Sequence, residues 1–179
     1  MTSTTKGPGG APVIGIAGWK NSGKTTLVER LIGEFARRGL KVATVKHAHH
    51  NFQIDDEATD SARHRRAGAS QVAIVSSSRW AIVTELRDAP EPDLPDVLQK
   101  LEPCDLILVE GYKSAPIPKI EARRREGRVG RSLSDEDPMV IAIASDHKVT
   151  GSALPSFALD DITAIADFII QSVSTRTKS

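Results

Sequence analysis

The sequence predicts an α/β fold in which a mostly parallel β-sheet carries helices on both faces, with some antiparallel edge strands. Short apolar runs alternate with stretches of helical periodicity along most of the chain. A glycine-rich loop joins the first apolar run, 13–17, to the first helical stretch. A later run, 106–109, is apolar at every position, which is typical of a strand covered on both faces of a parallel sheet.

The N-terminal part of the chain predicts a βαβ unit. Val13–Ala17 has the composition of a strand, and residues 24–38 have the apolar spacing of a helix that ends at Gly39. The second strand is expected at 42–45. Strands joined through a helix in this way lie parallel in one sheet.

The middle of the chain predicts a helix followed by a hairpin. After a polar loop, a helix is expected around 58–67, ending near Gly68. Two β-rich runs follow at 71–76 and 79–84, and the Ser-rich break between them allows antiparallel pairing.

The C-terminal half returns to alternating helices and strands. A proline-rich link at 89–95 precedes a helix near 96–101 and the buried strand at 106–109. The remaining expected elements are an edge strand at 118–122, a central strand at 140–144 and a closing amphipathic helix at 162–173.

Length and composition indicate one globular domain. The 179 residues with 39% apolar content suffice for a single core, which we expect at 13–173. The polar segments 1–12 and 174–179 are expected to be flexible.

Charge and cysteine content restrict the classes of partner and compartment. Lys and Arg total 24 against 23 Asp and Glu, so no global field favours nucleic acid or an anionic membrane as a partner. Cys104 is the single cysteine and no secretory signal is evident, so we expect a cytoplasmic protein.

The octapeptide at 18–25, GWKNSGKT, carries the strongest functional signal. It matches G-x-x-x-x-G-K-[ST] between a strand and a helix, which is the context of a phosphate-binding loop. The fold is therefore expected to be a P-loop NTPase-like three-layer sandwich. Lys24 would bridge the β- and γ-phosphates of a nucleotide and Thr25 would bind Mg²⁺. The expected nucleotide contacts of this loop are Gly18, Asn21, Ser22, Gly23, Lys24, Thr25 and Thr26.

A magnesium site needs further oxygen ligands, and the strand end at Glu110 supplies one. Glu110 would act with Lys24 and Thr25 in phosphoryl transfer, although a strand-end Glu also occurs as a plain surface residue. Asp55 or Asp56 could join the metal shell, so the expected metal ligands are Thr25, Glu110 and Asp55.

Three histidines, His47, His49 and His50, follow the second strand, where ligands of open α/β folds collect. We expect a loop that contacts phosphate or a partner; transition-metal binding is the alternative.

Base recognition has no standard motif in this chain. Asp146 follows the strand at 140–144, and its carboxylate could accept both N1–H and N2–H of guanine. The alternative is an Asx turn at the strand end.

Five arginines lie within residues 123–131. No aromatic residue is interleaved, so an RNA clamp is not indicated. We expect a flexible surface loop, with phosphate contact or partner docking as alternatives.

Several blocks in this order resemble the molybdopterin-guanine dinucleotide biosynthesis protein B family, over roughly residues 13–173. The resemblance implies a homodimer that binds GTP with Mg²⁺, hydrolyses it weakly, and assists the nucleotidyltransferase that joins GMP to molybdopterin. The blocks that carry it are Gly15–Gly18, Val45–His50, Asp60–Ala69, Arg79–Ala81, Asp105–Lys113, Pro118–Glu121 and Ala142–Asp146.

Other functions use the same loop. No catalytic Gln or arginine finger can be named from the sequence, so a non-hydrolytic adaptor that delivers GTP or the pterin cofactor is an alternative to the slow GTPase. A P-loop small-molecule kinase and a metal-delivery GTPase using the histidines are the more distant alternatives.

Overall fold

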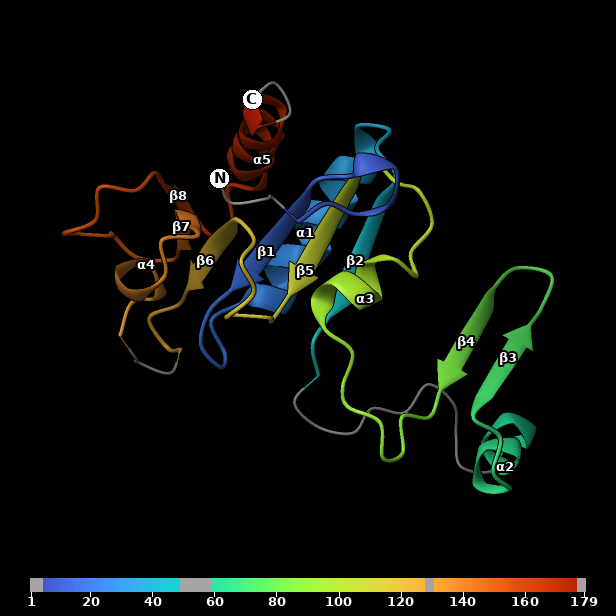
Figure 1. Cartoon of the computed structure of the whole chain (residues 1–179). Coiled ribbons are helices and arrows are strands. Elements are labelled where there is room, and N and C mark those ends of the chain that lie inside the picture. The colour runs from blue at the N-terminus through green and yellow to red at the C-terminus, as the bar shows by residue number, and fades with distance from the viewer. Residues whose placement is uncertain (1–4, 49–58, 128–130, 177–179) are drawn as a thin grey trace. The chain divides into compact units, whose positions relative to one another are not determined.

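The computed structural model of the chain describes residues 5–48, 59–127 and 131–176. The chain divides into two compact units, shown in Figure 1. The larger unit comprises Met1–His47 and Leu94–Ser179, and the smaller one comprises Ala48–Asp93.

The larger unit is built on a six-stranded sheet with the strand order β2-β5-β1-β6-β7-β8. Every pairing within this sheet is parallel. The predicted α/β class is therefore confirmed. The two strands of the predicted βαβ unit, β1 and β2, lie on either side of β5. The strands are β1 (Val13–Ala17), β2 (Val42–Lys46), β5 (Leu106–Glu110), β6 (Lys119–Arg123), β7 (Val140–Ser145) and β8 (Ser156–Ala158).

Helices cover both faces of this sheet, as β1 illustrates. Ile14 and Ile16 point into a core shared with α1 (Lys24–Arg37) and α5 (Ile162–Arg176). Val13 and Ala17 point to the opposite face, where Val13 packs in the cluster of α3 (Leu94–Leu98) and Ala17 in that of α4 (Leu133–Glu136). Figure 1 shows α1 and α3 on opposite sides of the sheet.

The expected edge strand at 118–122 is wrong in its position, because β6 is an internal strand between β1 and β7. Its charged residues Lys119 and Glu121 are only 1% exposed. Lys119 Nζ donates to Asp137 Oδ2 at 2.8 Å, and Glu121 Oε1 accepts from the Leu133 N–H at 3.0 Å. Buried polar groups are tolerated when they are paired in this way.

Short elements and helix starts account for the other differences. The sequence did not predict η1 (Pro8–Gly10), α4 or β8, which have three or four residues each and so show no periodicity. Helix α3 begins at Leu94, two residues before the expected start, because Pro95 is compatible with the first turn of a helix.

The smaller unit contains α2 (Asp60–Arg66), β3 (Gln71–Val75) and β4 (Trp80–Thr84). The two strands pair antiparallel, which confirms the hairpin and places the antiparallel pairing in a sheet of its own. Val72 on one face of β3 is buried, and β3 contacts α2. The helices in the described ranges include none that is long and apolar enough to cross a membrane.

Candidate nucleotide-binding site

The loop between β1 and α1 has a backbone that requires glycine at both ends. Gly18 lies so close to its neighbours that an added Cβ would meet the Ala122 carbonyl oxygen at 2.5 Å. Gly23 has φ +90°, a left-handed conformation that side chains disfavour. Between them, Asn21 also takes a positive φ of 64°. These conformations curl the chain tightly ahead of the helix.

Helix α1 begins directly after this curl, with Gly23 as its N-cap. No side chain of the described residues caps this helix, so the N–H groups of its first turn face outward without an intrahelical acceptor. The buried Ser22 Oγ also lacks a hydrogen-bond partner among the described residues. Unpaired donors beside a helix N-terminus suit a phosphate group.

The parallel register brings an acid and a hydroxyl together at the rim of this loop. Glu110 at the end of β5 lies opposite Ile16 of β1 and Lys46 of β2. Thr25 Oγ1 donates to Glu110 Oε1 at 2.7 Å, and Lys46 Nζ lies 3.6 Å from the same oxygen. A hydroxyl and a carboxylate are hard oxygen ligands of the kind that Mg²⁺ takes. The structure thus brings together Thr25 and Glu110, two of the expected metal ligands.

Lys24 lies in a strongly positive environment. Its Nζ donates to the Trp19 carbonyl at 2.8 Å. Burial lowers the pKa of Lys24 from 10.5, and the nearby Lys113 and Lys46 lower it further, against an opposing effect of Glu110. Lys113 Nζ lies 4.0 Å from the centre of the Trp19 ring. An anion placed among these ammonium groups would relieve their mutual repulsion.

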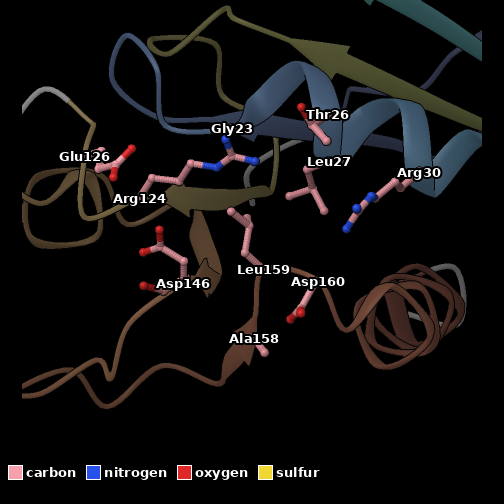
Figure 2. Close-up of a pocket in the computed structure, with 11 residues that line it drawn as sticks. Gly23, Thr26, Leu27, Arg30, Arg124, Glu126, Asp146, Ala158, Leu159 and Asp160 are labelled. Atoms are coloured by element: carbon pink, nitrogen blue, oxygen red, sulfur yellow. The ribbon is translucent and has the colours of Figure 1, made fainter.

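A cavity of about 450 Å³ opens beside the loop. Figure 2 shows that it extends from the start of α1 to the ends of β7 and β8. Its volume falls in the usual range of small-ligand sites. Gly23 and Thr26 line it at the loop, and Asp146 lines it at the far side.

Asp146 lies at the cavity, and part of its carboxylate is already bonded. Its Oδ1 accepts the Arg125 N–H at 2.9 Å and lies 2.8 Å from His147 Nδ1. The hydrogen bond with His147 is the main reason why the pKa of Asp146 is lowered. Within the described part of the chain, Oδ2 has no protein partner, which leaves it available to a ligand.

The basic stretch 123–131 is only partly the free surface loop that we expected. Arg123 is half-buried and donates to Glu121 at 2.8 Å. Arg124 lines the cavity, and the Arg131 carbonyl accepts from Trp19 Nε1 at 2.9 Å. Residues 128–130 lie outside the described ranges.

The histidine segment is described only at its start. The His47 N–H donates to the Glu110 carbonyl at 2.9 Å, and its ring packs 4.7 Å from that of Tyr112. His49, His50, Asp55 and Asp56 lie outside the described residues. In the ranges that are described, no cluster of three or more His, Cys, Asp or Glu side chains is arranged to hold a metal.

Sequence reasoning did not assign Lys46, Lys113 or Arg124 to the site. Lys46 is the last residue of β2 and directly follows the β-rich run in the sequence. This position could have indicated a cation at the end of the strand. Lys113 and Arg124 follow β5 and β6, so the general rule that ligands meet the carboxyl ends of parallel strands applies to both.

The chain is similar in sequence to proteins of a known family. Residues 13–146 match the family described as Molybdopterin guanine dinucleotide synthesis protein B. The chain is 42% identical over 163 residues to the Molybdopterin-guanine dinucleotide biosynthesis adapter protein of Haemophilus influenzae, covering 88% of this chain and 87% of that one. It is 35% identical over 162 residues to the Escherichia coli protein of the same name, covering 89% and 92%.

Solved structures show the same architecture. The crystal structure of a molybdopterin-guanine biosynthesis protein B matches with a TM-score of 0.69 at 26% identity, covering 89% of this chain and 98% of that one. Bacillus subtilis MobB matches with a TM-score of 0.64 at 26% identity, covering 89% and 96%. With the family match extending over more than half of its length, the chain belongs to the molybdopterin-guanine dinucleotide synthesis protein B family.

Proposed function

We propose that the chain binds GTP with Mg²⁺ at the loop 18–25 and serves as an accessory protein in the formation of molybdopterin-guanine dinucleotide. The observation that carries the nucleotide proposal is the Thr25–Glu110 contact at the rim of an uncapped helix N-terminus that opens into a cavity. The pathway is supported by the printed names of the relatives, which are biosynthesis adapter proteins.

At the phosphate end, Thr25 and Glu110 would hold Mg²⁺ directly or through its water shell. Lys24 would leave the Trp19 carbonyl and bind the β- and γ-phosphates, while the amides of Asn21 to Thr26 hold the phosphate oxygens. Lys46 and Lys113 lie close enough to contribute to the positive field on the same groups.

At the base end, Asp146 supports guanine over adenine. Guanine presents N1–H and N2–H side by side, and a carboxylate can accept both, whereas adenine offers no such donor pair. Asp146 lines the cavity and its Oδ2 is available to one of these donors, while the second donor would share Oδ1 with the Arg125 N–H.

An adaptor role fits the site better than an efficient GTPase. Phosphoryl transfer at a useful rate needs a water-positioning side chain or an arginine finger close to the γ-phosphate. The side-chain groups described in contact with Thr25, Glu110 and Lys24 are lysines and one carboxylate, and none of them is a glutamine or an arginine. We infer that hydrolysis by the isolated protein is slow and that bound nucleotide serves mainly to engage the nucleotidyltransferase.

Lys24→Ala should weaken GTP binding by about tenfold to a hundredfold, because it removes a charge-assisted contact to phosphate. Isothermal titration calorimetry with GTP and Mg²⁺ measures this. Lys20→Ala is the matched control, since Lys20 is an exposed lysine of the same loop. Full affinity in the Lys24 variant would exclude this loop as the phosphate site.

The unaltered chain should prefer GTP to ATP, and Asp146→Asn should reduce that preference.

Nucleotide binding should take up protons in the alkaline range. The pKa of Lys24 is lowered below 10.5 in the free protein, and a bound polyphosphate raises it again. Between these two values, binding restores the proton on Lys24, so affinity should fall as the pH rises. Calorimetry at a series of alkaline pH values up to 10.5, in buffers of different ionisation enthalpy, detects the uptake. Identical heats in both buffers would contradict it.

The adaptor and GTPase roles differ in their need for hydrolysis. If the chain is an adaptor, a non-hydrolysable GTP analogue should enhance the activity of the nucleotidyltransferase as well as GTP does. This chain is first loaded with GTP or with the analogue, and excess nucleotide is removed. The nucleotidyltransferase, supplied separately with GTP as its substrate, is then added, and formation of the guanine dinucleotide is measured. Enhancement by GTP only would show that hydrolysis is required.

We further propose that the chain forms a homodimer through the hairpin of the smaller unit. Val75 pairs with Trp80 and Ala73 with Ile82, so these side chains share one face of the hairpin. Val75, Trp80 and Ile82 are 76%, 60% and 54% exposed. A contiguous apolar face of this kind is typical of an association surface, and a two-stranded sheet is marginal alone.

Ile82→Lys should convert the dimer to a monomer, because it places a charge within this face. Size-exclusion chromatography with light scattering measures the mass. Ser78→Lys adds the same charge in the turn of the same hairpin, outside the apolar face, and should leave the mass unchanged. An unaltered mass in the Ile82 variant would place the interface elsewhere.

A further inference from the structure

Arg124 is a cation that touches the phosphate-binding loop without being bonded to it. The residue follows β6 and is exposed. A Cβ added to Gly23 would lie 2.7 Å from Arg124 Nε and 3.2 Å from Cζ, so the guanidinium group rests on Gly23. Among the described residues, no hydrogen bond or ion pair engages this guanidinium.

Leu159 extends the surface that the guanidinium begins. Its Cδ2 lies 3.2 Å from the same point above Gly23, so the two side chains converge on one side of the loop. Both line the cavity, and Figure 2 shows Arg124 reaching toward Gly23 with Leu159 beside it. Together they form one wall of the cavity, which is apolar at Leu159 and planar and cationic at Arg124.

The turn that carries Arg124 lies close to the phosphate-binding loop and to Asp146. At one end, a side chain on Gly127 would approach the Asn21 carbonyl oxygen at 3.5 Å. At the other, the Arg125 N–H donates to Asp146 Oδ1 at 2.9 Å. The Arg124 side chain therefore lies between the expected phosphate site and the carboxylate expected to recognise the base edge.

We propose that the Arg124 guanidinium, together with Leu159, forms the surface on which the purine base of the bound nucleotide stacks. The inference rests on the nucleotide binding proposed above. A base held at its edge by Asp146 needs support on its face, and the residues lining the cavity include no aromatic ring. A guanidinium is planar and weakly hydrated, and it stacks favourably on π-systems. Three lysines already serve the phosphate end, so phosphate binding does not require this residue.

The test compares nucleotides with a probe that has no base. Arg124→Ala should weaken GTP and ATP binding by a similar factor of about ten, and leave the affinity for magnesium tripolyphosphate unchanged. Arg124→Lys, which keeps the charge and loses the planar group, should recover only part of the loss. Arg125→Ala is the matched control, because it removes the neighbouring exposed arginine and retains the N–H bonded to Asp146. Calorimetry with each of the three ligands gives the affinities.

The outcomes separate this inference from the function on which it rests. Equal weakening of tripolyphosphate would make Arg124 a phosphate ligand and overturn the stacking role, and unchanged nucleotide affinity would overturn it as well. Equal affinity of the unaltered chain for GTP and ATP would overturn the guanine assignment alone, because stacking is independent of the base edge. Failure of the unaltered chain to bind any nucleotide would overturn both proposals.

Discussion

The parallel register of β2, β5 and β1 is the constraint on which the candidate site depends. Glu110 ends β5 opposite Lys46 of one neighbour and Ile16 of the other, just before the loop that leads to Thr25. A shift of one residue along β5 would turn Glu110 to the opposite face of the sheet. The hydrogen bond to Thr25 and the nearby lysine charges therefore exist because buried apolar side chains such as Ile107 and Leu108 fix that register.

This arrangement places several lysine side chains close together at the carboxyl end of the sheet, where their positive charges repel one another. Burial lowers the pKa of Lys24, and the charges of Lys113 and Lys46 lower it further. Such a cluster is unfavourable for the folded chain alone, since like charges repel more strongly where water is partly excluded. Functional sites commonly carry this kind of cost, because the ligand that binds there supplies the opposite charge.

The sequence predicted the local parts of this structure and not the long-range ones. The loop 18–25 and the acid after 106–109 could be recognised because each depends on adjacent residues. The internal position of β6 could not, because the buried Glu121 carboxylate is hydrogen-bonded by the amides of Leu133 and Ser134, which lie 12 and 13 residues further along the chain. Lys46 and Arg124 were missed for the same reason: their place in the site depends on which strands are neighbours. The hairpin was predictable from its short Ser-rich turn.

The two tryptophans of the chain give each compact unit its own optical reporter. Trp19 sits in the phosphate-binding loop, with an ammonium group over its ring and its indole N–H bonded to Arg131. Trp80 stands on the hairpin, largely in contact with solvent. Indole fluorescence depends on the polarity and charge around the ring. Replacing Trp80 by Phe would leave a signal that reports ligand binding at the loop, and replacing Trp19 by Phe would leave one that reports desolvation of the hairpin.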